Sequence, residues 1–194
     1  MRTSVAVMIV ILAGVAPCHG QDAPIVTAQP VATSREMLHK YIGATFGLDG
    51  ALHATFFSAL SHWQDSPPEW GSGTTGYAKR WTSKYAQSAI GNTAKYGMAS
   101  IFHHDPSFAI CQCTGFGRRL RHAVVSPFVA RTRDGRQVFS TASLSGFITG
   151  HVVSSSTWYP AQHGARDGLQ DAGVSLMSTI GVDIFKEFRP RRPR

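Results

Sequence analysis

Small side chains dominate this sequence and constrain how its segments can pack. Gly, Ala, Ser and Thr account for 75 of the 194 residues, whereas leucine occurs nine times. Glycine and alanine on a helix surface let two helices approach closely, so a chain with few large aliphatic residues can still form a bundle. Hydrophobic residues make up 43% of the chain and charged residues 15%, which excludes a disordered polyelectrolyte.

The first twenty residues have the order of a secretory signal peptide. Arg2 precedes an apolar run, residues 5–16, that is too short to span about 30 Å of hydrocarbon. Cys18 and Gly20 are small residues at the positions needed for cleavage after Gly20. We therefore expect a signal peptide at 1–20 and export to the periplasm or outer envelope. A lipoprotein acylated at Cys18 is the alternative, although Pro17 immediately precedes that cysteine.

Beyond the signal peptide, the sequence predicts one all-α domain. Residues 21–33 are expected to form a flexible leader, residues 34–189 a single helical domain, and residues 190–194 a basic tail. Helical periodicity recurs along the chain and the connections are short, which is typical of a compact bundle of five or six helices. The oligomeric state is left open.

Four segments carry apolar residues at three- and four-residue steps, the spacing of an amphipathic helix. These segments are 33–63, with a possible break at 47–50, then 75–102, 116–131 and 169–188. Asp134-Gly135 predicts a turn after the third segment. In the last segment, Asp183 and Glu187 lie one helical turn apart and are expected to offset the charges of Lys186 and Arg189.

Residues 138–157 are compatible with two conformations. Their β-branched residues favour a strand, whereas Gly146 and Gly150, four residues apart, suit a closely packed helix. Residues 137–165 contain no Asp, Glu, Lys or Arg, as a membrane span would. The many serines and threonines among them favour a buried bundle helix over a span.

The positive charge of the chain is concentrated in two places. The formal net charge is +8, and residues 118–136 contain six arginines and one aspartate, while residues 189–194 contain four arginines. Such clusters attract phosphate, anionic lipid head groups or acidic polymers. For an exported protein, anionic lipid or envelope polymer is the expected partner rather than nucleic acid, with Arg118, Arg119 and Arg121 as candidate anion-binding residues. A merely solvated basic face is the alternative.

Residues 71–76 match the glycine pattern of dinucleotide-binding loops but lack its context. The preceding residues, 67–70, do not form a buried strand, and the next acidic residue after Glu69 is Asp105. The amides that begin the following helix, with Lys79 and Arg80 one turn in, predict instead a site for phosphate or carboxylate. A soluble binding module for an anionic ligand at 75–80 is therefore one alternative function.

Two histidines and two cysteines are candidate metal ligands: His103, His104, Cys111 and Cys113. Imidazole and thiolate suit zinc or copper, but this spacing matches none of the usual zinc patterns. An enzyme that uses His103, His104 and Asp105 as metal ligands or acid/base groups is the second alternative function. Neither a His-Glu-x-x-His helix nor a Gly-x-Ser-x-Gly turn occurs in the sequence. No cofactor is predicted.

A series of short motifs runs through most of the chain after residue 20. Ser66-Pro67 is followed by Trp70-Gly71-x-Gly73-x-x-Gly76-Tyr77-x-Lys79-Arg80, His103-x-Asp105-Pro106, Gly115-Phe116-x-x-Arg119, Trp158-Tyr159-Pro160 and Glu187-Phe188. In this order the motifs resemble a family of uncharacterised exported bacterial proteins. The resemblance implies export and implies no activity. That family has an aromatic-rich Asp-Pro-Arg segment followed by glycines where this chain has Cys111 and Cys113, so the resemblance gives these cysteines no shared role.

The function expected from the sequence is therefore that of a non-enzymatic, exported envelope protein. It would associate with the membrane surface or with an anionic envelope polymer through its arginine clusters.

Overall fold

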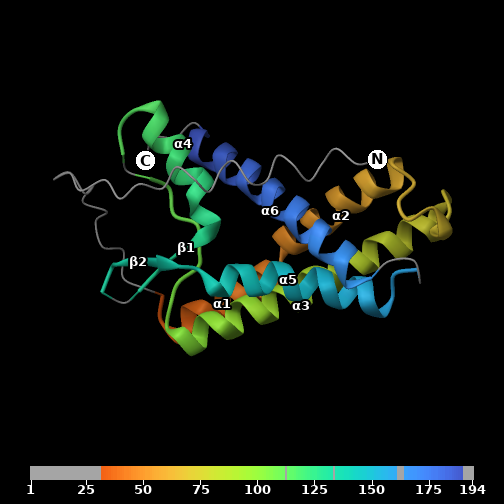
Figure 1. Ribbon diagram of the computed structural model, residues 1–194, viewed down its shortest axis with the longest axis horizontal. Helices are drawn as coiled ribbons and strands as arrows, with labels where there is room; N and C mark the ends of the chain where they lie inside the picture. Colours follow the sequence, from red (N-terminus) through yellow and green to blue (C-terminus); the bar gives the residue numbers. More distant parts are fainter. Residues whose placement is uncertain (1–31, 112, 133, 161–163, 190–194) are drawn as a thin grey trace.

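Six α-helices, two 3-10 turns and one short hairpin form the part of the chain that the computed structural model describes, residues 32–111, 113–132, 134–160 and 164–189 (Figure 1). In chain order they are α1 (Ser34–Phe46), α2 (Leu48–Trp63), η2 (Pro68–Trp70), α3 (Thr74–Phe102), α4 (Phe116–Val125), η3 (Ser126–Phe128), β1 (Val129–Arg131), β2 (Gln137–Phe139), α5 (Thr141–Thr157) and α6 (Ala165–Phe188). The predicted helical bundle is confirmed. The predicted signal peptide, the basic tail and residues 21–31 of the leader lie outside the described residues.

The first helical segment divides at Gly47, as its glycines predicted. A capping box starts α1: the Glu36 amide donates to the Thr33 hydroxyl over 3.3 Å, and the Thr33 amide donates to the Glu36 carboxylate over 2.6 Å. Gly47 has an extended backbone between α1 and α2. A Cβ there would collide with the carbonyl of Gly43, so glycine permits this tight junction.

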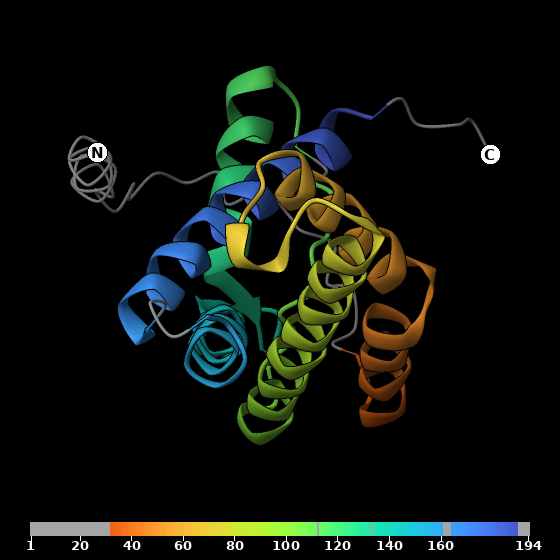
Figure 2. The same ribbon diagram turned by 90° about the vertical axis from the view of Figure 1, so that its right-hand side faces the viewer.

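Helix α3 forms the centre of the bundle, with α1 and α2 on one side and α5 and α6 on the other (Figure 2). Its contact with α5 is made backbone to backbone. A Cβ placed on Gly91 would lie 2.9 Å from the carbonyl oxygen of Gly146, and one on Gly150 would lie 2.7 Å from the carbonyl oxygen of Gln87. The expectation that small residues allow close helix approach is confirmed at this contact.

Residues 141–157 form a helix rather than a strand. Ser140 caps α5 by accepting a hydrogen bond from the Ser143 amide, and α5 packs between α3 and α6. Among the described residues, no helix has the length and apolar content needed to cross a bilayer.

The predicted helix 116–131 is wrong over its last six residues. Helix α4 ends at Val125 and passes into η3, where Pro127 has no amide hydrogen to continue the helical hydrogen bonds. The chain then pairs β1 with β2 in antiparallel register, with Ala130 opposite Val138, across the turn predicted at Asp134-Gly135.

Helix α6 begins four residues before the predicted segment 169–188. Its buried side has Gly168, Ala172, Leu176 and Ile180 at four-residue steps, whereas Leu169 is 52% exposed. Asp183 and Glu187 continue the buried side, so both carboxylates are inside the bundle rather than on its surface.

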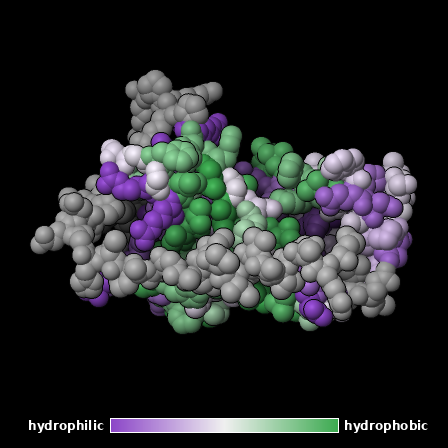
Figure 3. Space-filling model, turned by 45° about the horizontal axis from the view of Figure 1, so that its top comes forward, coloured by the Kyte–Doolittle hydropathy of each residue, from purple (hydrophilic) through white to green (hydrophobic). Residues whose placement is uncertain are grey.

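The bundle has small and polar residues inside and large apolar residues outside. The largest buried apolar side chains among the described residues are those of Met37, Leu176 and Ile180. Exposed apolar residues follow three helices: Leu38, Ile42 and Phe46 on α1, Leu48, Leu52, Phe56, Leu60 and Trp63 on α2, and Leu169, Val174, Met177, Val182 and Phe185 on α6. Figure 3 shows hydrophobic residues gathered in the middle of one face and hydrophilic residues toward its two ends.

Candidate functional site

A cavity of about 500 Å³ lies where α3, α5 and α6 approach η3 and residues 106–110. Small-molecule sites in proteins have volumes of about 300–1,000 Å³. In the part of the chain that the structure describes, four charged residues line the cavity: Lys95 from α3, and Asp183, Lys186 and Arg189 at the end of α6. Both its size and its convergent charges therefore fit a binding site for a small molecule.

Lys95 and Asp183 are charged residues of this cavity whose pKa values the protein environment shifts. Burial lowers the pKa of the Lys95 amine, although the attraction of Asp183 opposes this shift. Burial also raises the pKa of the Asp183 carboxyl, opposed by Lys186 and Lys95. The Lys186 amine lies 3.6 Å from the Asp183 carboxylate and forms an ion pair with it. The Lys95 ammonium and the Asp183 carboxylate are thus both held where water solvates them poorly.

Aromatic and aliphatic side chains form the remaining walls of the cavity. Tyr96, Phe108, Ile110 and Phe147 contribute apolar surface. The Lys95 amine lies 5.6 Å from the centre of the Tyr96 ring, within the range of a cation–π contact. The cavity can therefore contact both a charged group and an apolar group of a ligand.

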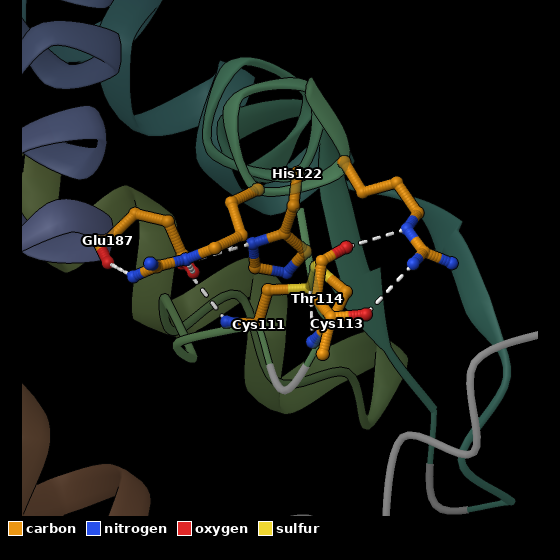
Figure 4. The surroundings of a disulfide bond; sticks show 7 residues. Cys111, Cys113, Thr114, His122 and Glu187 are labelled. Carbon is orange, nitrogen blue, oxygen red and sulfur yellow. Dashed lines mark hydrogen bonds and ion pairs between the residues drawn. A yellow bond between two sulfur atoms is a disulfide. The ribbon is translucent and has the colours of Figure 1, made fainter. Parts of the chain in front are cut away.

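Beside this cavity, the carboxylate of Glu187 is buried between α4 and α6 (Figure 4). Arg119 Nε lies 3.2 Å from Glu187 Oε1, and its guanidinium also donates to the backbone carbonyl of Glu187. The Cys111 amide donates to Oε2 over 3.0 Å, and Nδ1 of His122 lies 3.5 Å from the same oxygen. Glu187 therefore fastens the end of α6 to α4 and to the segment that carries Ile110 of the cavity wall.

Cys111 and Cys113 are joined to each other by a disulfide next to Glu187 (Figure 4). Their sulfurs are not thiolates in this form and do not act as metal ligands. His103 is exposed at the end of α3 in the left-handed conformation, and His104 stacks on Phe102 at 6.0 Å. In the described ranges, no three His, Cys, Asp or Glu side chains are grouped to hold a metal ion. The structure does not bring the four predicted ligands together.

Asp105 is buried and tied to other elements rather than grouped with the two histidines. The Lys40 amine lies 2.9 Å from its Oδ2, and the Ser107 amide donates to its Oδ1 over 2.9 Å. Burial alone would raise the pKa of Asp105, but the hydrogen bonds from Ser107 and Lys40 outweigh it and hold this pKa below the usual value. Its backbone also pairs with that of Arg131. This position suits a structural role at the junction of α1, α3 and β1.

The predicted anion-binding residues do not form one site. The first turns of α3, with Lys79 and Arg80, and helix α4, with its three arginines, lie at opposite ends of the molecule (Figure 1). Lys79 and Arg121 are exposed. Arg118 donates to the carbonyl and hydroxyl oxygens of Thr114, while Arg119 binds Glu187.

Arg80 is 1% exposed and binds the loop between α2 and α3. Its guanidinium donates to the carbonyl oxygens of Ser66, Pro67 and Gly71, forms an ion pair with Asp65 at 3.0 Å, and lies 3.1 Å from Nδ1 of His62. Five contacts match the five N–H groups that an arginine possesses. The side chain is thus occupied by the chain itself.

A second polar cluster lies between α3 and α5, outside the cavity. The Gln87 amide donates to Nδ1 of His151, which requires that this nitrogen carry no proton. Burial, and then the nearby charges of Lys84 and His53, lower the pKa of His151 from 6.5 to about 4. His151 is therefore neutral in the folded protein near pH 7.

Sequence reasoning did not single out Lys95 or the buried position of Asp183. A signal for each exists in the helical period. Lys95 follows Gly91 by four residues and precedes Ala99 by four, so it shares the side of α3 that packs on α5. Asp183 follows the buried Ile180 by three residues and precedes Glu187 by four.

Comparison of the chain with family models, curated proteins and solved structures finds no match. The resemblance to exported bacterial proteins is untested by these comparisons and stays a prediction.

Proposed function

We propose that this chain is a peripheral protein of the cell envelope that lies on an anionic lipid surface. The outer apolar face, defined as Leu38, Ile42 and Phe46 of α1 with Leu48, Leu52, Phe56, Leu60 and Trp63 of α2, would enter the membrane interface. The signal peptide predicted at 1–20 supports export, which would bring this face to an envelope membrane.

The observation that carries the proposal is the exposure of this face. Leu48 is 74% exposed, Phe56 65% and Trp63 82%. On α2 the opposite side, with Gly50, Ala54 and Ser58, is the buried one. A contiguous row of large apolar side chains in water marks an interaction surface. Inserting two of them fully would contribute about 3–6 kcal/mol, enough for micromolar-range attachment once basic residues add their attraction.

Exposed basic residues favour an anionic lipid over a neutral one. Arg118 and Arg121 are exposed on α4, and each basic residue near a negatively charged leaflet contributes about 1 kcal/mol. An anionic polymer would use these charges but would leave the outer apolar face without a partner. A lipid surface would take up the outer apolar face, and the arginines of α4, which packs on α6, would add a general attraction to it.

Sedimentation with vesicles tests the proposal. The full chain is expected to sediment with vesicles of phosphatidylglycerol and phosphatidylcholine, and less with phosphatidylcholine alone. The triple variant Leu52→Ser, Phe56→Ser, Trp63→Ser should bind about a hundredfold more weakly, because it removes most of the inserted apolar area. Residues 5–16 are themselves apolar, so the comparison is between parent and variant chains that both carry them.

The matched control is Phe139→Ser on β2, which removes a residue that is 59% exposed but lies outside the outer apolar face. Its vesicle binding should equal that of the parent. Equal binding of the triple variant and the parent would refute the proposal. Binding to soluble anionic polymer that the triple variant keeps in full would instead favour the polymer as partner.

A further inference from the structure

We propose that the cavity between α3, α5 and α6 binds a small organic carboxylate whose apolar body occupies the aromatic side of the cavity. This inference does not depend on membrane attachment, because it concerns the open cavity lined by α3, α5 and α6 rather than the outer apolar face. Size, charge and the free hydrogen-bonding groups of the cavity each support it.

Lys95 is the residue of this cavity that favours a negatively charged ligand. Its amine makes no hydrogen bond or ion pair with any residue in the described part of the chain. An ammonium group in a poorly solvated place is costly unless an anion is paired with it. Asp183 is the only acidic residue among the described residues that line the cavity, and its carboxylate is paired with Lys186. Asp183 attracts the Lys95 amine without forming an ion pair with it, so a ligand anion would be the first direct partner of this amine.

The charges of the lining select a head group with a single negative charge. Lys95, Lys186 and Arg189 outnumber Asp183, so the cavity attracts anions. Lys186 is engaged with Asp183, and Arg189 is exposed at the edge, which leaves one inward ammonium unpaired. A carboxylate matches that single charge, whereas a doubly charged phosphate would place its second charge near the Asp183 carboxylate.

A hydroxyl group on the adjoining helix α5 also lines the cavity and adds a second donor. The Ser143 hydroxyl accepts a hydrogen bond from the Ser140 hydroxyl over 2.8 Å, which leaves its own proton free to donate. Ser143 and Lys95 belong to α5 and α3, whose backbones touch at Gly91 and Gly146. An ammonium and a hydroxyl from two fixed helices form a preorganised pair of donors for a carboxylate.

The apolar walls of the cavity indicate that the rest of the ligand, beyond its carboxylate, is apolar. Tyr96, Phe108, Ile110 and Phe147 give the cavity a hydrophobic side adjacent to the charges. Transfer of a short alkyl chain or an aromatic ring into this space contributes about 0.8 kcal/mol for each buried CH₂ group. A carboxylate without such a body, or an alkyl chain without a charge, would use only half of the site.

Calorimetric titration of the full chain without vesicles tests the proposal. The probes are octanoate and 2-naphthoate, both below any aggregation concentration, with octanol and inorganic phosphate as comparisons. One molecule of octanoate or of naphthoate per chain should bind, and the preference between them identifies an alkyl or an aromatic body. Octanol should bind at least about tenfold more weakly, since it lacks the charge that pairs with Lys95.

Two variants assign the binding to this cavity. Lys95→Met keeps the length of the side chain and removes its charge, so octanoate binding should fall about tenfold or more while the thermal midpoint stays equal or rises. Ser143→Ala should weaken binding by about three- to tenfold. Lys79→Met is the matched control on the same helix, outside the cavity, and should bind octanoate within about twofold of the parent.

Three outcomes would overturn the proposal. Unchanged octanoate binding in Lys95→Met would show that the ligand is held elsewhere. Octanol as tight as octanoate would mean that the cavity is only an apolar space. Loss of binding in Lys79→Met, with Lys95→Met unaffected, would move the site to the start of α3.

Discussion

Arg80 shows how a single side chain can have a role opposite to the one its charge suggests. Its place at the start of α3 predicted a contact with an external anion, yet its guanidinium is buried among carbonyl oxygens of residues 66–71. The loop between α2 and α3 has few apolar residues of its own to hold it. Arg80 supplies the missing contacts and fixes this loop.

Replacing Arg80 should therefore destabilise the whole bundle. Arg80→Met leaves buried carbonyl groups and Asp65 without their donor, so the free energy of unfolding should fall by about 3–5 kcal/mol. Arg80→Lys should recover little, because a single ammonium cannot reproduce the planar fork of five N–H groups. Urea unfolding followed by circular dichroism measures both losses.

The neighbouring Lys79 gives a control at the same helix turn. Lys79 is exposed, and Lys79→Met should change the free energy of unfolding by no more than about 0.5 kcal/mol. A loss below about 1 kcal/mol in Arg80→Met would contradict the structural role assigned to this residue.

At the level of helices, the α3–α5 contact depends on the absence of side chains. Gly91→Ala would place a Cβ 2.9 Å from the Gly146 carbonyl oxygen, so one helix must shift. The free energy of unfolding should fall by about 1–3 kcal/mol. Gly97 lies on the same helix with open space around it, so Gly97→Ala should stabilise the protein by about 0.5–1 kcal/mol.

Thermal or urea unfolding of the two alanine variants decides this point. Opposite signs are expected, because both variants gain helix propensity and only one creates a clash. Stabilisation by Gly91→Ala as well as by Gly97→Ala would mean that α3 and α5 are not in backbone contact.

The period of the sequence was sufficient to predict where most helices lie. It predicted α3 to within one residue and a possible break at 47–50, where α1 and α2 meet at Gly47. It missed the hairpin after α4 because the helical spacing continues through Pro127, and a local pattern does not show that β1 and β2 pair.

The helical spacing of apolar residues in the sequence could not show which side of a helix is buried. On α2, Leu52 and Phe56 share one side while Ala54 and Ser58 share the other. Transfer out of water favours burial of the first side, whereas close backbone approach favours burial of the second. In this fold the side with the small residues is buried. The cavity around Lys95 follows from the same arrangement, because the glycine-bearing helices α3 and α5 bring that lysine inside.

For the whole molecule, stability should depend on pH through His151. Its pKa is about 4 in the folded protein and about 6.5 in an unfolded chain, as burial, Lys84 and His53 all disfavour its charge. The unfolded chain therefore binds the additional proton between pH 6.5 and 4. Stability is fully present above pH 6.5 and falls through this window by roughly 3 kcal/mol at most.

Urea unfolding at pH 7 and pH 5 measures this loss. The parent should lose more stability than His151→Asn, which stays neutral at both pH values. His53 faces the same Lys84 and also has a pKa lowered by burial, so part of the loss remains in the variant. His103→Asn, at an exposed histidine, should follow the parent. An identical loss in the parent and in His151→Asn would contradict the assignment.

Because the helices touch through glycine, alanine and serine, the large residues on the outside contribute little to holding the frame together. Surface composition is thereby uncoupled from folding. Replacing the leucines and phenylalanines of α2 by polar residues should therefore leave the fold unchanged and give it a hydrophilic surface.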